Sequence, residues 1–567
     1  MQWNDFTMRA LSISLSIVSM LASHSVIAAC PDIKPAPRTI NDTAENYSKS
    51  PGFSLNEEGI LQFDYGAHHG GLGKWANPFF DSNYALALYR DWLKSECKDD
   101  ALKENFLHQA KWLASTAKVD GDIASWPLPF RDKNFDLDPG WISGIGQSRI
   151  AGVLLRAEAI TDDPELHEIA RKALHAYDVD IKDGGVVTVD DQVTWIEEMA
   201  DPKGRSYKVL NGHITGLSGI LDFYEITHEQ KWKDLFDRGV AAVKRDIPKF
   251  DAGFSSYYSL LMPSQKRPIA PLGDYNPLHV SQLLWLYEKS NDPVFLDYAM
   301  RFQAYETNKD SFSASSSIDP VRHGPDSVRA KYGSSYWSVG QFPAWFDITT
   351  PQPELIRGLS FDVSEVEQAP AKFTVLAEVD GKMVQVAASP DVLSKNTDII
   401  FDKPVLTGRV RIDMPVPGPK KMVALRMAML LRQNTLRAPV ANECNHTYDS
   451  RKKVNPNNID SAFDGDDETA MTVICDGWIV SEVGKDSLVS VRSSASEDKA
   501  IKFYGSDDLA AWTEIENEDS RSAHIPFKFV KFDIDTSMKG IVEVTETKVE
   551  DMGVLKRIKL FFMRLFS

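Results

Sequence analysis

The chain has few cysteines and lacks the short motifs of cofactor chemistry. Four cysteines occur in 567 residues. No His-Glu-x-x-His, no paired Cys-x-x-Cys and no glycine-rich phosphate loop is present. Such motifs supply zinc ligands, redox dithiols and phosphate cradles. The sequence therefore predicts no catalytic metal and no cofactor.

Positive charge is also scarce. The formal net charge is −18, from 63 Lys and Arg against 81 Asp and Glu. A chain this acidic repels polyanions at long range, which argues against non-specific nucleic-acid binding. An acidic polymer would need a local basic groove on this protein.

No run of residues after the N-terminal region is long and uncharged enough to span a bilayer. The stretch from Met8 to Cys30 has one Arg, an apolar centre and small residues before a Cys, which is typical of a secretory signal over residues 1–29. Two outcomes stay open. Lipidation of Cys30 would anchor the protein to a membrane and leave Cys97 alone. Cys30–Cys97 and Cys444–Cys475 disulfides would instead suit an oxidising periplasm.

Apolar residues recur at helical spacing from about residue 80 to 310. Four segments repeat the order helix, acidic turn, helix, and their turns fall at intervals of 63, 66 and 63 residues, at Asp100, Asp163, Glu229 and Asp292. Repeats of this kind encode stacked helical hairpins. We predict an α/α toroid over residues 40–345, with the loops between repeats gathered on one face as the site.

The pattern changes after Pro351 to short alternating stretches separated by Gly and Pro, which predict strands. We expect two β-sandwich, jelly-roll-like domains at 351–440 and 441–548, so the fold class is multidomain α plus β. The second block is similar to discoidin-type modules of carbohydrate enzymes. Its Asp464, Asp466 and Asp467 are dense enough in oxygen to allow a structural Ca²⁺, but we favour an ordinary acidic turn.

Residues 549–567 form a basic tail with apolar residues on one helical face. This composition suits contact with a membrane surface. A terminal helix docked on the β domains is the alternative.

Four loop stretches in the helical part carry the aromatic and acidic side chains that sugar chemistry uses. They are SWPLPFRDKNFDLDPGWISGIGQ (125–147), WIEEM with SYKVLNGHITGL (195–217), FDAGFSSYYSLL (250–261) and GDYNPLHVSQLLWLY (273–287). The candidate substrate-binding residues are Trp126, Arg131, Lys133, Trp141, Gln147, Arg149, Asn211 and His279. Each also has an alternative without function. The tryptophans can be core residues, since tryptophan is highly buried on average, and the histidine can pack against the helix that follows it.

In order and spacing, these stretches resemble the C-terminal domain of the D-glucuronyl C5-epimerase family. The matching segments include DPGWISGIGQSRIAGVLLRA, WIEE, VLNGHITGLSGILDFYE, FDAGFSSYYSLL and GDYNPLHVSQLLWL, within about residues 125–306. The resemblance implies an α/α toroid that acts on uronic-acid residues of a polysaccharide through catalytic tyrosines.

Residue by residue, Tyr258 and Tyr275 match two family tyrosines. The third falls on Met199, directly after Glu197 and Glu198, and the family's Arg–His pair falls on Leu261 and Met262. Tyr207, a little downstream, is the candidate replacement for the third phenol. The candidate catalytic residues are Glu197, Glu198, Tyr207, Tyr258 and Tyr275.

The C5 proton of a uronate lies next to a carboxylate, so its removal needs stabilisation of an enediolate-like intermediate. A phenol with an ordinary pKa near 10 acts as base near neutrality only if cations lower that pKa. Arg131, Lys133 and Arg149 are the candidate cations. We predict an exported C5-epimerase of an acidic polysaccharide, with a lyase or glycoside hydrolase on the same toroid, or a non-catalytic glycan-binding protein, as alternatives.

Overall fold

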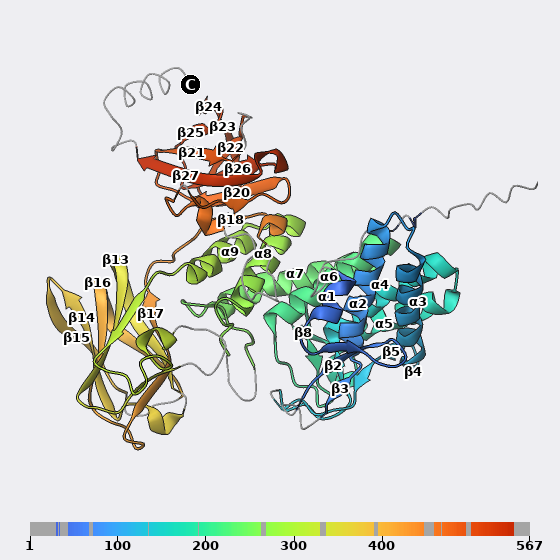
Figure 1. The fold of residues 1–567 in the computed structure, drawn as a ribbon, viewed down its shortest axis with the longest axis horizontal. Coiled ribbons are helices and arrows are strands. Elements are labelled where there is room, and N and C mark those ends of the chain that lie inside the picture. Colours follow the sequence, from blue (N-terminus) through green and yellow to red (C-terminus); the bar gives the residue numbers. More distant parts are fainter. Residues whose placement is uncertain are drawn as a thin grey trace, which may run out of the picture.

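The computed structural model describes residues 30–31, 33, 43–66, 72–133, 135–190, 192–261, 268–328, 336–363, 365–390, 395–446, 459–466, 468–494 and 500–548. Helices form the N-terminal part, drawn blue to green in Figure 1, and strands form the yellow and red parts. The predicted signal segment and the basic tail lie outside the described residues. No helix within the described ranges is long and apolar enough to cross a membrane.

The helical part is a row of four hairpins. Its helices are α2 (Pro78–Lys94), α3 (Asp100–Ser115), α4 (Gly144–Thr161), α5 (Pro164–His175), α6 (Leu210–Thr227), α7 (Gln230–Asp246), α8 (Tyr275–Ser290) and α9 (Pro293–Glu306). The members of each hairpin pack together, and the even-numbered helices contact each other in the order α2, α4, α6, α8. Four helical hairpins were predicted; the toroid itself stays a prediction.

Each acidic turn of the repeat lies at the beginning of the second helix of its hairpin. Asp163 and Asp292 are the N-caps of α5 and α9, where their side chains accept hydrogen bonds from backbone N–H groups and Pro follows in the first turn. A carboxylate at this position satisfies a donor that the helix leaves unpaired, and Pro at the first position lacks that donor. Asp99 caps α3 in the same way, one residue before the predicted turn residue.

Short strands surround the helices. They are β1 (Phe53–Leu55), β2 (Leu61–Asp64) and β3 (Lys74–Trp75) near α1 (Ala44–Lys49), then β4 (Lys118–Asp120), β5 (Ile123–Ser125), β6 (Pro127–Leu128), β7 (Trp141–Ser143), β8 (Val187–Asp190), β9 (Val193–Ile196) and β10 (Met199–Ala200). Strands β10, β7 and β6 form one small sheet, and β8 pairs with β9. These strands lie in the loops that precede α4 and α6.

The first β domain differs from the predicted sandwich. Its strands are β11 (Ser311–Ala314), β12 (Trp337–Val339), β13 (Ala344–Val363), β14 (Lys372–Val379), β15 (Lys382–Ala388), β16 (Asn396–Val416) and β17 (Val423–Arg432). All seven belong to one antiparallel sheet. Register shifts interrupt the long strand β13 after Thr349 and Ile356, and bulges of this kind bend a strand. The sheet thus encloses its own apolar core, and its first strand precedes the predicted boundary at 351.

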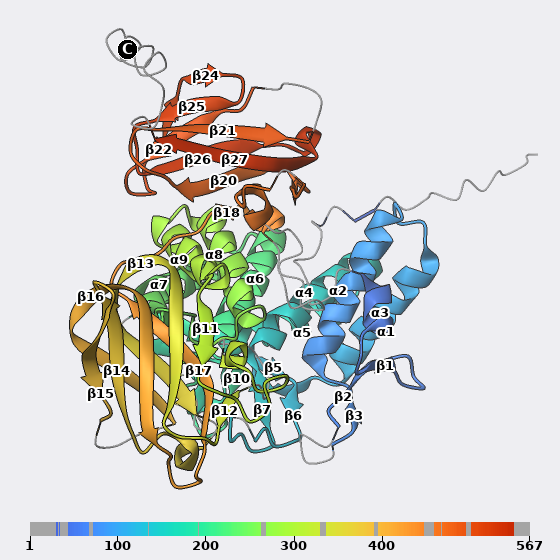
Figure 2. The same cartoon turned by 60° about the vertical axis from the view of Figure 1, so that its left-hand side comes forward.

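The C-terminal module is a sandwich of two five-stranded antiparallel sheets, as expected. One has the order β18 (Val440–Ala441), β20 (Gly477–Glu482), β26 (Phe529–Ile534), β22 (Phe503–Ser506), β23 (Thr513–Ile515), and the other β19 (Met471–Thr472), β27 (Gly540–Lys548), β21 (Ser487–Ser493), β25 (Ser522–Ile525), β24 (Asn517–Asp519). An apolar cluster fills the space between them. Figure 2 shows α8 and α9 between this module and the seven-stranded sheet.

Both predicted disulfides are present. Cys30 bonds to Cys97 and Cys444 to Cys475, with Cα atoms 5.6 Å and 6.3 Å apart. A lipid on Cys30 would need the same sulfur atom, and the localisation stays a prediction.

The acidic turn at Asp464 and Asp466 holds itself together. Backbone N–H groups of Asp466 and Glu468 donate to the carboxylates of Asp464 and Asp466, at 3.0 Å each. Asp467 lies outside the described residues. Among the described residues, no group of three His, Cys, Asp or Glu side chains is placed to hold a metal ion.

Candidate active site

The loops that precede α4, α6 and α8 meet on one side of the helical part. The N–H of Gly144, which begins α4, donates to the carbonyl oxygen of Glu198 at 3.0 Å, and the N–H of Leu210, which begins α6, donates to that of Tyr258 at 3.1 Å. Tyr275 is the first residue of α8. Backbone hydrogen bonds thus bring together three side chains that are far apart in the sequence.

Glu198, Tyr258 and Tyr275 form a compact cluster that solvent reaches in part. The two phenol rings meet edge to face, with centroids 5.0 Å apart and planes at 79°. The hydroxyl of Tyr258 hydrogen-bonds the carboxyl group of Glu198. The second carboxyl oxygen, Oε2, has no hydrogen-bond partner among the described residues. The Tyr258 hydroxyl therefore orients the carboxyl group of Glu198, and Oε2 is a buried oxygen against the first turn of α6.

Burial sets the protonation of this cluster. It raises the pKa of Glu198 to about 7, with Asp132 adding to the rise and the Tyr258 hydrogen bond opposing it. Burial also raises the pKa of Tyr258 well above its ordinary value, and the charge of Glu198 adds to that effect. The prediction that cations lower the pKa of a phenol here is wrong for Tyr258. The group that changes charge near neutrality is Glu198.

The first turn of α6 accommodates Glu198. A Cβ at Gly212 would lie 2.4 Å from both Cβ and Oε2 of Glu198, so only glycine leaves room for this side chain. The neighbouring Asn211 is buried, and its side-chain oxygen has no hydrogen-bond partner among the described residues. Gln282 of α8 donates to the Asn211 backbone carbonyl at 3.0 Å. Asn211, a predicted substrate-binding residue, thus directly precedes the glycine that lies against Glu198.

The two candidate tryptophans are core residues rather than sugar platforms. Trp126 is 4% exposed and donates its indole N–H to the carbonyl oxygen of Leu113 at 2.8 Å. Trp141 is 7% exposed and donates to the carbonyl oxygen of Phe130 at 3.0 Å. A buried indole with a satisfied N–H has no face left for a sugar, which is the physical reason for this correction.

Gln147 and Arg149 are buried in α4. Gln147 is buried and donates to the carbonyl oxygens of Ala124 and Ala173. Arg149 is buried in α4, where its guanidinium approaches Ser218 of α6 at 3.4 Å. Both side chains tie elements of the helical part together, and their role in substrate binding stays a prediction.

Two further candidates, Glu197 and Tyr207, are buried next to the site and bond to the protein. The fully buried carboxylate of Glu197 accepts hydrogen bonds from the hydroxyls of Thr188 and Ser206 and from the N–H groups of Tyr207 and Lys208. The buried phenol of Tyr207 donates to the carbonyl oxygen of Phe135 at 2.8 Å and lies 3.1 Å from Asp201 Oδ2. Their polar atoms serve the fold, so the proposal below assigns neither of them a catalytic role.

The remaining candidates are two exposed cations, Arg131 and Lys133, and a buried histidine, His279. Arg131 and Lys133 are exposed, and Arg131 forms an ion pair of 2.6 Å with Asp136. His279 is fully buried, its Nδ1 lies 2.7 Å from the hydroxyl of Ser256, and burial lowers its pKa to about 3. It is a neutral packing residue of α8, so the packing alternative holds for it.

The sequence did not indicate two further residues of the site, Tyr65 and Asp132. Tyr65 packs against the apolar cluster that also receives Tyr258, and its hydroxyl accepts a hydrogen bond of 2.7 Å from Asn77. Asp132 raises the pKa values of Tyr65, Glu198 and Tyr258. Tyr65 comes from the strand region before α2, with no local pattern that connects it to the others. Met199 is buried in the same cluster.

Comparison with known proteins decides the family. The family described as "D-glucuronyl C5-epimerase C-terminus" matches residues 120–304, the segment that carries Glu198, Tyr258 and Tyr275. This segment belongs to the D-glucuronyl C5-epimerase C-terminal family. The D-glucuronyl C5-epimerase of Caenorhabditis elegans is 28% identical over 221 residues, which cover 36% of this chain and 35% of that protein.

The epimerase-family domain has an archaeal relative as well. An uncharacterized protein of Methanocaldococcus jannaschii is 29% identical over 248 residues, 41% of this chain and 78% of that protein.

Among solved structures, the family 32 carbohydrate-binding module of C. perfringens NanJ, in complex with galactose, is 14% identical with a TM-score of 0.20, and the match covers 21% of this chain and 92% of that one.

Proposed function

We propose that the protein is a uronate C5-epimerase that acts on an acidic polysaccharide through Glu198 and Tyr275. One observation carries this proposal: a carboxyl group with a pKa of about 7 lies beside two phenols in a partly exposed cluster. A general base works best when its pKa is close to the working pH. The family of residues 120–304 supports the same chemistry. The toroid predicted from the sequence is the arrangement that we propose for the hairpins.

The reaction needs one group that removes a proton and one that returns it to the opposite ring face. Ionised Glu198 takes the C5 proton, and the electron pair of the broken C–H bond passes into the substrate carboxylate as an enediolate. Tyr275 then donates its phenolic proton to the other face of C5, which forms the inverted C–H bond. We assign the donor role to Tyr275 because the hydroxyl of Tyr258 already bonds Glu198. Proton return from Glu198 to the Tyr275 phenolate, by way of solvent, restores the enzyme.

The start of α6 supplies the electrostatic support for this intermediate. Glu198 lies against the first turn of α6, and the N-cap residue Val209 offers no side-chain cap. The N-terminal end of a helix carries a partial positive charge, which favours an anion. A substrate carboxylate beside Asn211 would lie at that end, so the N-terminus of α6 would stabilise the negative charge of the enediolate.

Incubation in D₂O tests the proposal directly. We expect deuterium to enter C5 of glucuronate residues in an unsulfated polymer of alternating glucuronate and N-acetylglucosamine, as followed by NMR. Tyr275→Phe should slow formation of the inverted, deuterated uronate about 100-fold or more, because it removes the donor to the opposite ring face. Tyr298→Phe, a phenol on α9, is the matched control and should leave the rate unchanged. Absence of exchange from every uronate polymer would contradict the proposal, and ultraviolet absorbance from unsaturated products would favour the lyase alternative.

The pH dependence follows from the pKa of Glu198. Only the ionised carboxylate takes a proton, so kcat/KM should rise with pH and level off above about pH 7. Tyr258→Phe removes a hydrogen bond that lowers the pKa of Glu198, so the midpoint should move to higher pH in this variant. A pH profile of the deuterium exchange measures both midpoints. A midpoint near the ordinary pKa of a glutamate would contradict the assignment of Glu198 as the base.

Secretion is consistent with this function, and the sequence of residues 1–29 is the main argument for it. The two disulfides suit an oxidising compartment, and residues 1–29 are typical of a signal segment. We propose that the enzyme works on its polymer outside the cytoplasm.

A further inference from the structure

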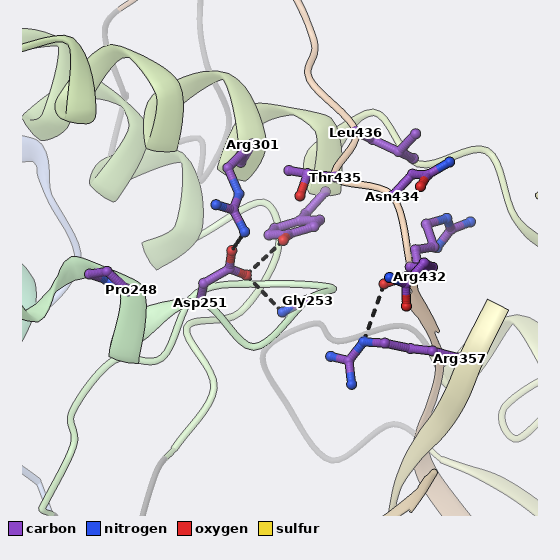
Figure 3. A pocket seen from close by; sticks show the side chains of 11 residues that line it. Pro248, Asp251, Gly253, Arg301, Arg357, Arg432, Asn434, Thr435 and Leu436 are labelled. Carbon is purple, nitrogen blue, oxygen red and sulfur yellow. Dashed lines mark hydrogen bonds and ion pairs between the residues drawn. The ribbon is translucent and has the colours of Figure 1, made fainter. Parts of the chain in front are cut away.

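A polar cavity of about 240 Å³ lies where the helical part meets the seven-stranded sheet, away from the phenols. Its walls come from the Asp251–Gly253 turn, from α9, from β13 and from the segment that follows β17. Figure 3 shows Arg301, Arg357 and Arg432 around it. The sheet lies outside residues 120–304, which match the epimerase family.

Two of the three arginines are neutralised by carboxylates. Arg432 forms ion pairs of 2.6 Å with both Asp310 and Glu354 and is almost fully buried. Arg301 pairs with Asp251, whose carboxylate also accepts a hydrogen bond of 2.7 Å from the hydroxyl of Tyr305. These groups build a rigid polar floor and offer little net charge to a ligand.

Arg357 is different, because it has no carboxylate partner among the described residues. Its Nε donates to the carbonyl oxygen of Arg432 at 3.3 Å, which fixes the direction of the guanidinium. Figure 3 shows the side chain reaching from β13 toward the turn at Gly253. A Cβ on Gly253 would lie 3.8 Å from Nη2 of Arg357, so that wall of the cavity is backbone. An oriented guanidinium with open N–H groups is suited to a planar carboxylate.

The opposite wall offers neutral hydrogen-bonding groups. The side chains of Gln433, Asn434 and Thr435 are exposed, line the cavity and make no hydrogen bond with another described residue. A carboxylate on Arg357 with amides and a hydroxyl around it is the environment that a uronic-acid residue, with one acid and several hydroxyls, would require.

We propose that this cavity binds a uronate residue of the acidic polysaccharide at a distance from the residue that reacts. The ligand class rests on the proposed function. The turn that lines the cavity begins the loop that carries Tyr258, seven residues after Asp251, which limits their Cα separation to about 25 Å. A short stretch of polymer spans such a distance, and a second contact raises the affinity for long chains. On a chain with a net charge of −18, this unpaired arginine supplies the local positive charge that an acidic polymer needs.

Isothermal titration calorimetry on the full chain tests the site. The ligand is an unsulfated decasaccharide of alternating glucuronate and N-acetylglucosamine, compared with the same decasaccharide after its carboxyl groups are reduced to alcohols. Arg357→Ala should weaken the Kd of the acidic ligand about tenfold, because it removes one charge-assisted pair in a partly exposed pocket. Arg357→Lys should recover part of the loss. Arg426→Ala, on the same sheet outside the cavity, is the matched control and should bind as wild type does.

Three results would overturn the proposal. Equal binding by wild type and Arg357→Ala, or no measurable binding by wild type, overturns the proposal. An equal loss for the acidic and the reduced decasaccharide overturns it as well, since Arg357 would then act through the fold and not on a carboxylate. Binding that depends on Arg357 without deuterium exchange at C5 would remove the epimerase function and keep the site, so the two proposals fail separately.

Discussion

Replacing Glu198 by glutamine should reduce the deuterium exchange at C5 by a factor of about 10²–10⁴ while the thermal midpoint of the protein stays unchanged. This is the range that a positioned general base contributes. The amide has the shape of the carboxyl group, fits the space above Gly212 and still accepts the hydrogen bond of Tyr258. It cannot take a proton. NMR of the polymer in D₂O and a calorimetric melt measure the two quantities.

The neighbouring Glu197 provides the matched control. It has the same side chain one residue away, but its carboxylate is fully buried and accepts four hydrogen bonds. Glutamine there places an NH₂ group against donors, which should cost about 1–3 kcal/mol of folding free energy per unsatisfied group. Glu197→Gln should therefore melt earlier but exchange deuterium well when folded. Full activity of Glu198→Gln, or a stable but inactive Glu197→Gln, would contradict this division of roles.

The helical hairpins were predictable because their signals are local. Asp163 with Pro164 and Asp292 with Pro293 are cap and first-turn residues that mark the start of a helix in any context. The repeat interval then places the other hairpins. By contrast, the predicted sandwich at 351–440 is a single sheet, because whether a strand of 20 residues bends depends on bulges and partners that its own alternation does not reveal.

The site was predictable only where a family pattern names residues. Tyr258 and Tyr275, which the resemblance named as catalytic candidates, lie in contact, and their catalytic role stays a prediction. Trp126 and Trp141 did not become sugar platforms, since burial depends on residues such as Leu113 and Phe130 that approach from elsewhere. Asp132 raises the pKa values of Glu198 and Tyr258 through space, and Tyr65 packs against the same apolar cluster as Tyr258; no spacing in the sequence encodes such proximity.

The family's third tyrosine is absent here, and its position shows why the proposal assigns the base to a carboxyl group. Met199 lies buried in an apolar cluster with Tyr207. No phenol is held at that position, and Tyr207 has its hydroxyl bonded elsewhere. Glu198 lies one residue before Met199, and burial raises its pKa to about 7. A phenol ordinarily has a pKa near 10, so the carboxyl group is the better base near neutrality.

The second large effect is expected at the ion pair between Arg156 of α4 and Asp222 of α6. Both side chains are almost fully buried and meet through two parallel hydrogen bonds of 2.8 Å. A Cβ on Gly152 would lie 2.8 Å from Asp222, so the helices approach closely at this point. Removal of one partner leaves a buried charge unpaired, which typically costs 3–5 kcal/mol, about 4 kcal/mol here.

Asp222→Ala should therefore lower the free energy of unfolding by about 4 kcal/mol, measured by urea denaturation of the helical part with circular dichroism. Asp237→Ala removes an exposed pair of 2.6 Å with Lys233 on α7, and should cost less than about 1 kcal/mol. The double variant Arg156→Met with Asp222→Leu should recover most of the loss, because apolar residues of similar size carry no buried charge. Similar losses for Asp222→Ala and Asp237→Ala would contradict this. Helices α4 and α6 begin at the loops that hold Glu198 and Tyr258, so the same variant should also lower the exchange rate at temperatures where the helices loosen.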